Sequence, residues 1–291
     1  MRLLIVGAAG QVGREITRQA CPQWTVRAVD RSALDITDSS AIGVIVSDFK
    51  PDIIINAAAY TAVDKAETEE KSAYAINCDG AKFLAQAAEK SGAALLHIST
   101  DYVFSGDKDG LYQETDATGP TGVYGASKLA GEKAIQQYCQ RHIIMRTAWV
   151  FGEFGNNFVK TMIRLAKDRD TLAVVGDQYG SPTWAGDIAN ALLTISQRIV
   201  EGSKIKWGIY HFSGFPYTNW YEFADKILTI ASNSALINHK PLIRSITTFD
   251  YPTPARRPLN SKLNCSKILE NFHIQPSDWQ AALKQLNSYI D

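Results

Sequence analysis

Apolar runs and helical patterns alternate along the first half of the chain. Helical patterns are clearest at Ala81–Lys90 and Ser127–Cys139. Continuous apolar runs are typical of a parallel sheet covered on both faces, since a half-exposed strand alternates apolar and polar residues. The alternation predicts right-handed crossovers and an α/β fold with a doubly wound, Rossmann-type parallel sheet. The predicted strands are Leu3–Val6, Thr25–Val29, Ile53–Asn56, Leu95–Ser99 and Ile143–Arg146.

The second half of the chain has a different pattern, because glycine, proline and aromatic residues become frequent after Trp149. A helix at Gly186–Gln197 and a strand at Gly208–Phe212 are expected to return to the sheet. The helical patterns at Trp220–Ala231 and Ser277–Ile290 are expected to form a smaller C-terminal lobe that binds substrate. The domains are therefore predicted to be interleaved: a Rossmann domain from residues 1–150 plus about 185–212, and a substrate-binding lobe from 151–184 and 213–291.

Composition narrows the classes of partner. The 30 basic and 30 acidic residues cancel, so no nucleic-acid partner is expected. The sequence has no secretory signal pattern and no run of about 18 apolar residues, so no membrane association is expected either. The cysteines form no CxxC pair and are interpreted as reduced thiols of a cytoplasmic protein. They are Cys21, Cys78, Cys139 and Cys265.

The strongest local signal for a cofactor is Gly7-Ala-Ala-Gly10-Gln-Val-Gly13, which follows the first predicted strand and opens a helix. Glycine permits unusual backbone angles, and it lets the backbone approach a pyrophosphate at the positive end of the helix. Three glycines alone also occur in structural turns. Their place at the start of a βαβ unit favours a dinucleotide site.

The residues after the second and third strands extend this site. Asp30 can accept hydrogen bonds from the adenosine ribose of NADH, while Arg31 can pair with the 2′-phosphate of NADPH, so the cofactor preference stays open. Asp35 and Ile36 are candidates to cap the adenine. A run of small residues after the third strand can pass close to the ribose and nicotinamide, although helix packing is a rival explanation. The run leads through Ala57, Ala58, Ala59, Tyr60 and Thr61.

Two segments carry the candidate catalytic chemistry. Thr100 and Asp101 follow a buried strand, and Tyr124 and Lys128 lie four residues apart at the start of a helix. A phenol can donate its proton to a carbonyl oxygen as hydride arrives, and a nearby ammonium lowers the phenol pKa from about 10. The Thr100 hydroxyl can add a second hydrogen bond to the developing alkoxide. A Tyr–Lys pair alone is an ordinary helical contact, but with the glycine loop it favours ketone reduction. His97 is instead interpreted as a core residue, and the five histidines form no metal-spaced cluster.

At these residues the chain resembles the extended short-chain dehydrogenases and, within them, the dTDP-4-dehydrorhamnose reductase family. The matching stretches run in order from residue 1 to about 265. They are GAAGQVG, LDITD, PDIIINAAAYTAVDKAE, AINCDGAKFLAQAA, HISTDYVFSG, YGASKLAGE, RTAWVFG, DQYGSPTW and ARRPLNSKL. The resemblance implies NAD(P)H-dependent reduction of dTDP-4-dehydro-6-deoxy-L-mannose to dTDP-L-rhamnose, a precursor of cell-surface polysaccharide.

The resemblance also implies roles for individual residues. Thr100, Tyr124 and Lys128 take the catalytic roles. Residues implied to line the cofactor are Gly10, Gln11, Val12, Asp30, Asp35, Ile36, Ala59, Tyr60, Thr61, Ile98, Tyr124 and Lys128. Residues implied to meet the sugar nucleotide are Thr100, Asp101 and Trp149.

Physical arguments support further substrate contacts. The Trp149 face is a suitable platform for an apolar sugar face. Arg256 and Arg257 can bind a diphosphate bidentately, although consecutive arginines also occur as surface charge. Asn156 and Asn157 are candidates to bind sugar hydroxyls, and an Asn-rich turn explains them almost as well.

A metal-mediated dimer is not expected, although some family members dimerise through Mg²⁺. Glu15 is a candidate ligand, but the helix Gly186–Gln197 has no acid beyond Asp187. A glutamate near a helix N-terminus also favours the helix dipole. The sequence thus assigns no metal ligand and leaves monomer and homodimer open.

Two other functions compete with reduction. A nucleotide-sugar epimerase or dehydratase shares this scaffold, but a dehydratase usually has Thr-Asp-Glu where this chain has Thr100-Asp101-Tyr102. A non-catalytic regulatory subunit, related to the partner of methionine adenosyltransferase, need not retain the Tyr–Lys pair. Tight cofactor retention without NAD(P)H oxidation would favour the regulatory function.

Overall fold

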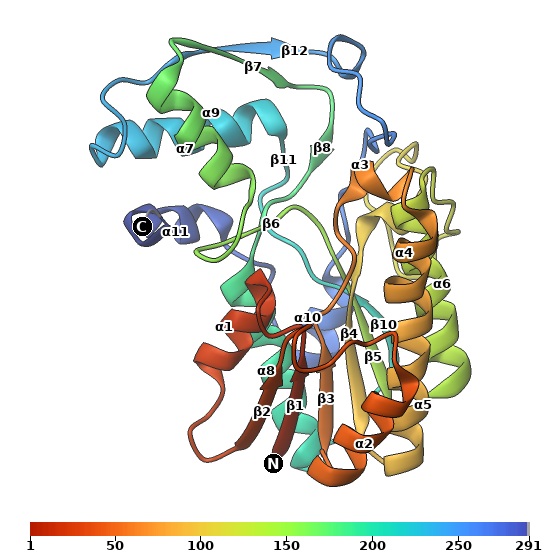
Figure 1. The fold of residues 1–291 in the computed structure, drawn as a ribbon. Coiled ribbons are helices and arrows are strands. Elements are labelled where there is room, and N and C mark those ends of the chain that lie inside the picture. The colour runs from red at the N-terminus through yellow and green to blue at the C-terminus, as the bar shows by residue number, and fades with distance from the viewer. Residues whose placement is uncertain (290–291) are drawn as a thin grey trace.

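A parallel sheet forms the centre of the computed structural model, which describes residues 1–289 (Figure 1). Within these residues the sheet has six strands in the order β10-β5-β4-β3-β1-β2, and every neighbouring pair is parallel. The doubly wound α/β fold predicted from the sequence is therefore confirmed. The strands are β1 (Arg2–Val6), β2 (Thr25–Val29), β3 (Ile53–Asn56), β4 (Ala94–Thr100), β5 (His142–Thr147) and β10 (Gly208–His211).

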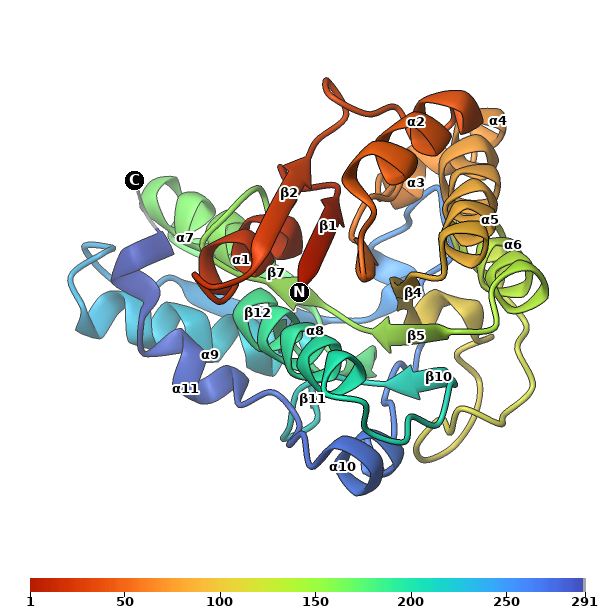
Figure 2. The same ribbon diagram turned by 90° about the horizontal axis from the view of Figure 1, so that it is seen from below.

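Helices cover both faces of this sheet, as the view from below shows (Figure 2). α1 (Gln11–Gln19) and α8 (Ala185–Val200) pack together on one face. On the other face lie α2 (Ser39–Phe49), α5 (Ala81–Ser91) and α6 (Val123–Tyr138). In β1, alternate residues join the two hydrophobic clusters: Leu3 and Ile5 face α1 and α8, while Leu4 and Val6 face α2 and α5. Burial on both faces explains why the strands are continuously apolar.

Helix α6 begins at Val123, so Tyr124 and Lys128 lie at the start of a helix as predicted, and the clearest helical pattern, Ser127–Cys139, covers the rest of it. Gly122 provides no side-chain cap, but the Val123 N–H donates to Glu67 Oε1 at 2.9 Å. This carboxylate, distant in sequence, thereby caps the positive end of the helix. Tyr124 is therefore held in regular helix one turn before Lys128.

The C-terminal lobe lies beyond one end of the central sheet (Figure 1), and it has its own hydrophobic core. β7 and β12 form a parallel pair against which α7 and α9 pack, and α11 closes the lobe. α10 instead packs against the central sheet, where Phe272 contacts Tyr210. The interleaved domain limits stay a prediction. The elements are α7 (Phe158–Asp168), β7 (Thr171–Val175), α9 (Trp220–Asn233), β12 (Leu242–Ile246), α10 (Ser266–Phe272) and α11 (Trp279–Leu283).

The single final helix predicted at Ser277–Ile290 is wrong over the described residues. Ser277 pairs with Gly214 in a β-bridge, so the chain is extended there. Asp278 then caps α11 by accepting from the Ala281 N–H at 2.9 Å. After α11 the chain continues as a 3₁₀ helix, Leu286–Tyr289, and Ile290 lies outside the described residues.

Short elements join the two lobes. β6 pairs with β9, and β8 pairs with β11. No helix within residues 1–289 is both long and apolar enough to cross a membrane. The short elements are α3 (Val63–Ala66), α4 (Glu70–Tyr74), the π-helical turn Ala75–Gly80, the 3₁₀ turns Asp101–Val103 and Thr248–Asp250, β6 (Val150–Phe151), β8 (Tyr179–Gly180), β9 (Thr183–Trp184) and β11 (Thr218–Asn219).

Candidate active site

A cavity of about 380 Å³ lies at the carboxyl ends of β1, β2 and β3. It follows the rule that ligands of such sheets bind beyond the carboxyl ends of the strands. Most of the predicted cofactor residues line it: Gly7, Gly10, Asp30, Arg31, Asp35, Ile36, Ala57, Ala58, Ala59, Tyr60 and Thr61. The sequence prediction did not include Val6, Ala9, Leu34, Ala62 and Ile76, which also line it.

Two of the predicted glycines are required by close packing. Gly7 has φ +84°, and a Cβ there would lie 2.4 Å from Ala58 N. A Cβ on Gly13 would lie 2.2 Å from Gly7 O. Gly7 thus lets the loop after β1 lie against the loop after β3, and Gly13 lets α1 lie against the loop after β1. Gln11 and Val12 lie in the first turn of α1, and no side chain caps this turn.

The two acids beside the cavity, Asp30 and Asp35, each accept hydrogen bonds from the residue two positions later in the chain. Asp30 Oδ1 accepts from the Ser32 hydroxyl at 2.6 Å and the Ser32 N–H at 2.9 Å. These bonds lower the pKa of Asp30, and bonds from Thr37 lower the pKa of Asp35 in the same way. Both acids are therefore charged at neutral pH. Asp30 and Arg31 both line the cavity, so the geometry accommodates either cofactor.

The predicted catalytic residues meet where β4 ends and α6 begins. The Thr100 hydroxyl donates to Asp101 Oδ1 at 3.0 Å, and it also contacts the Tyr124 phenol. Loss of hydration raises the pKa of Tyr124 to about 12; the Thr100 contact opposes this shift and Asp101 adds to it. The phenol is therefore protonated at neutral pH, as a proton donor must be.

The expected acidification of Tyr124 by Lys128 is absent from this arrangement. Lys128 Nζ donates to Ile98 O at 2.7 Å and lies 3.1 Å from His97 Nε2. Both contacts are to residues of β4, and Lys128 has no comparable contact with the Tyr124 phenol. Burial lowers the pKa of Lys128 to about 8, against the opposing effect of Glu132.

Asp101 is a buried acid whose environment the sequence did not disclose. Burial raises its pKa to about 6, although hydrogen bonds from Ser261 and Thr100 oppose the shift. Its Oδ2 atom is buried and has no hydrogen-bond partner among the described residues. Ser261 lies in the ARRPLNSKL stretch, so the resemblance covered it, but no local pattern placed it beside Asp101.

A second cavity of about 540 Å³ lies between the two lobes. Arg257 lines it, with its Nη2 donating to Asp64 Oδ2 at 2.7 Å and its Nη1 buried without a hydrogen-bond partner in the described residues. Arg256 lies elsewhere, exposed and paired with Asp107 at 3.2 Å. The sequence prediction missed Asp64, Tyr102 and Arg169, which also line this cavity.

The predicted aromatic platform is partly occupied. The Trp149 and Trp220 rings are stacked, with centroids 3.6 Å apart and planes 13° apart. A sugar therefore cannot lie on the Trp149 face that Trp220 covers. Asn156 is exposed, whereas Asn157 caps α7 and donates to Gln11 Oε1 at 3.0 Å. Asn157 thereby links the lobe to the start of α1.

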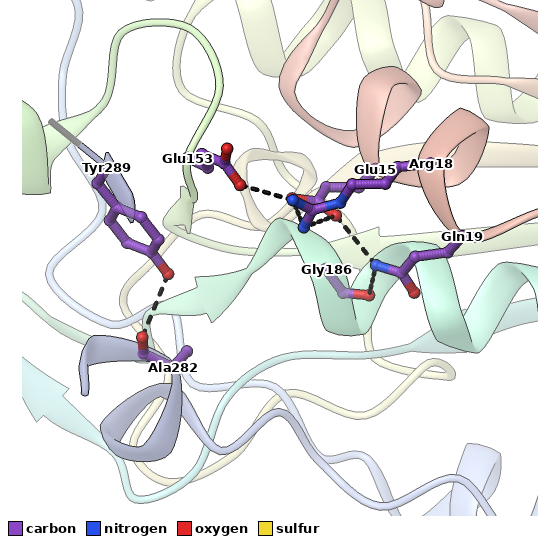
Figure 3. A network of polar contacts seen from close by, with 7 residues as sticks. All are labelled: Glu15, Arg18, Gln19, Glu153, Gly186, Ala282 and Tyr289. Atoms are coloured by element: carbon purple, nitrogen blue, oxygen red, sulfur yellow. Dashed lines mark hydrogen bonds and ion pairs between the residues drawn. The ribbon is translucent and has the colours of Figure 1, made fainter. Parts of the chain in front are cut away.

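The residues present do not fit a magnesium ion at Glu15 (Figure 3). Both Glu15 carboxylate oxygens accept from Arg18 Nη2, at 2.8 and 2.7 Å, and Gln19 Nε2 adds a bond at 3.0 Å. Arg18 also pairs with Glu153 at 2.6 Å. Within residues 1–289 no group of three or more His, Cys, Asp or Glu side chains is placed to hold a metal ion. The guanidinium already supplies the positive charge that a cation would bring.

A cavity lined by a glycine loop at the carboxyl edge of a doubly wound sheet, together with a Tyr–Lys helix at the same edge, is typical of an oxidoreductase of the extended short-chain dehydrogenase type. The family model described as RmlD substrate binding domain matches residues 1–290. A relative from Aggregatibacter actinomycetemcomitans, named dTDP-4-dehydrorhamnose reductase, is 51% identical over 100% of this chain and 99% of its own length. The chain belongs to the dTDP-4-dehydrorhamnose reductase family.

Solved structures agree with this assignment. A dTDP-4-dehydrorhamnose reductase from Clostridium acetobutylicum has a TM-score of 0.89 and 39% identity, covering 98% of each chain. One from Bacillus anthracis, in complex with NADP, has the same TM-score and 38% identity, covering 98% of this chain and 97% of that one. A dTDP-glucose 4,6-dehydratase from Streptomyces venezuelae is only 19% identical and shows the fold alone. The dehydratase and regulatory alternatives are not favoured.

Proposed function

We propose that the protein reduces the C4 keto group of dTDP-4-dehydro-6-deoxy-L-mannose, with NADPH or NADH, to give dTDP-L-rhamnose. The observation that carries the proposal is the Tyr124–Thr100 contact at the carboxyl edge of the sheet, on the same edge as the dinucleotide cavity. The names of the relatives at 42–51% identity support this substrate.

The side chains divide the work of reduction. When bound, the nicotinamide supplies the hydride. Tyr124 holds the proton that the C4 oxygen receives, and Thr100 donates a second hydrogen bond to that oxygen as charge develops. Lys128 is proposed to bind the cofactor ribose, with Ile98 at the same edge.

The second cavity is proposed to hold the sugar nucleotide. The Arg257 guanidinium offers several N–H donors for the diphosphate, and Arg169 lines the same cavity. Asp101, with its unpartnered Oδ2, is proposed to meet a sugar hydroxyl. Trp149 and Asn156 stay proposed contacts, with Trp149 limited to the part of its ring that Trp220 leaves open.

Location and partner class belong to the same proposal. All four cysteines are free, which supports a reducing, cytoplasmic compartment. The balanced charge supports a small-molecule substrate rather than nucleic acid.

A coupled assay tests the proposal. The keto sugar is generated from dTDP-glucose by the preceding dehydratase and epimerase activities, and NADPH oxidation is followed by absorbance. We expect one NADPH oxidised per sugar and a product with the NMR spectrum of dTDP-L-rhamnose. No oxidation with saturating keto sugar, while NADPH binds normally, would contradict reduction.

A further inference from the structure

A series of buried hydrogen bonds connects the cofactor loop to Lys128. The Ala58 N–H donates to Asn56 Oδ1 at 3.0 Å, and Asn56 Nδ2 lies 3.0 Å from His97 Nδ1. On the far side of the imidazole, His97 Nε2 lies 3.1 Å from Lys128 Nζ. Asn56, His97 and Lys128 are each 1% exposed. Because water does not reach these atoms, every donor needs an acceptor within the series.

The backbone sets the direction of the series. The Ala58 N–H can only donate, so the atom that it meets must be the oxygen of the Asn56 amide. The nitrogen of that amide then faces His97 Nδ1, and it too can only donate. His97 Nδ1 must therefore be unprotonated. Burial and Lys128 hold the pKa of His97 well below its ordinary value, so the ring is neutral and carries its hydrogen on Nε2.

This tautomer selects a protonation state for Lys128. The His97 Nε2–H is aimed at Lys128 Nζ, which already donates to Ile98 O at 2.7 Å. An ammonium has three donors and no acceptor, so a donor would face a donor. A neutral amine has a lone pair that accepts from Nε2–H and still donates to Ile98. Burial acts in the same direction, since it lowers the pKa of Lys128 to about 8.

The charges around Lys128 do not reverse this preference. Glu132, one turn further along α6, favours the ammonium. However, Arg146 donates two hydrogen bonds to the Glu132 carboxylate, of 2.9 and 2.6 Å, and so neutralises its charge. The π-helical turn packed on α6 presents a neutral amide, since Asn77 donates to Ser127 at 3.0 Å. The elements packed against α6 carry other titratable or charged groups: Asp101 and Tyr102 on the 3₁₀ turn, Cys78 and Asp79 on the π-helical turn, Asp64 and Lys65 on α3, Glu70, Lys71 and Tyr74 on α4, and Lys82, Glu89 and Lys90 on α5. On α6 itself lie Tyr124 and Lys133, and Glu67 lies at its start.

We propose that His97 is a positioning residue of the reaction: Asn56 holds it as the Nε2–H tautomer, and in that form it favours the neutral amine of Lys128 until the cofactor binds. Lys128 then takes up one proton from solvent, R–NH₂ + H⁺ giving R–NH₃⁺. The diphosphate and ribose oxygens of a dinucleotide favour an ammonium through charge and hydrogen bonding. The Lys128 ammonium, which lowers the pKa of Tyr124, thus becomes the dominant form when the cofactor is bound. The inference rests on the proposed function, since it takes NAD(P)H as the ligand.

Proton uptake on cofactor binding tests the inference directly. NADH is titrated into the protein by calorimetry between pH 7 and pH 9, in pairs of buffers with different ionisation enthalpies, which yields the number of protons bound. NADH is the probe because it lacks the 2′-phosphate and its titration. We expect the wild type to take up a substantial fraction of one proton, with the largest uptake above pH 8, where most of the free lysine is an amine and the bound lysine remains an ammonium.

Two variants should lose this uptake. In His97→Gln, an amide oxygen can turn to accept from the lysine, so the ammonium is already present in the free protein. In Asn56→Asp, the carboxylate can only accept, so Nδ1 carries the hydrogen and Nε2 accepts from the ammonium. Each variant should show at most half of the wild-type uptake. His142→Gln, a buried histidine at the start of β5 bonded to Cys139 O, is the matched control and should behave as the wild type.

The outcomes separate the two proposals. NADH that binds without proton uptake by the wild type overturns the role of His97 and leaves the proposed function intact. Unchanged uptake in either folded variant also overturns that role. Failure of both NADH and NADPH to bind contradicts the proposed function itself, and this inference falls with it. If His97→Gln does not fold, the wild type and Asn56→Asp still decide the question.

Discussion

The two cavities are built from the chain in opposite ways. The first cavity is lined by one stretch of sequence, from Val6 to Ile76, at the edge of a single sheet. The second cavity is lined by residues as far apart as Asp64 and Arg257, and it spans two lobes. A site on one rigid edge depends on local backbone geometry, whereas a site between lobes depends on contacts across the molecule. Substitutions should therefore separate cofactor binding from sugar binding.

The largest expected effect is at Tyr124, whose ring lies 5.4 Å from that of Tyr102, a residue that lines the second cavity. Tyr124→Phe should lower kcat by about 100-fold or more, because the proton donor is lost while the ring remains. NADPH affinity should stay nearly unchanged. Steady-state kinetics and cofactor titration measure both quantities, and Tyr138→Phe at the far end of the same helix is the control. Near-normal turnover of Tyr124→Phe would remove this residue from the proton-donor role.

A second substitution should act on the cavity between the lobes alone. Arg257→Met should raise the KM for the sugar nucleotide by about 10- to 100-fold, because a charge-assisted hydrogen bond contributes roughly 1.5–3 kcal/mol. The Kd for NADPH should not move, since Arg257 does not line the first cavity. Arg256→Met is the control, because its guanidinium is exposed and pairs with Asp107. Equal effects of the two substitutions would contradict diphosphate binding by Arg257.

The same contrast explains what the sequence could disclose. Gly7 and Asp30 follow strands directly, so a local pattern placed them on the sheet edge where they lie. Ser261 reaches Asp101 only because the segment after α9 returns to pair with Tyr112 and Tyr179, and no local periodicity encodes that return. Likewise, His97 alternates with core residues in β4, so its pattern predicts burial but not its hydrogen bond to Asn56. The stacking of Trp149 on Trp220 depends on the same long-range packing.

A smaller effect, on stability, is expected from Asp101. Its pKa is raised to about 6 from an ordinary value near 4, so the folded protein binds a proton that the unfolded chain has released in that range. The free energy of unfolding should therefore fall as pH rises from about 4 to 6, by on the order of 1–3 kcal/mol. Asp101→Asn should remove this part of the pH dependence, as urea unfolding at several pH values would measure. If the free energy of unfolding of Asp101→Asn depended on pH as that of the wild type does, Asp101 would already be charged below pH 6.

The smallest expected effect is that of removing divalent cations. Glu15 is fully buried and its carboxylate is bound by Arg18, so EDTA should change neither the melting temperature nor the sedimentation coefficient. The variant Arg18→Gln tests whether the guanidinium takes the place of a metal ion, because it leaves Glu15 and Glu153 without the cation that they share. That variant should be less stable than the wild type and should regain stability with millimolar Mg²⁺. Stabilisation of the wild type by Mg²⁺, reversed by EDTA, would show that the guanidinium does not replace a metal on this face.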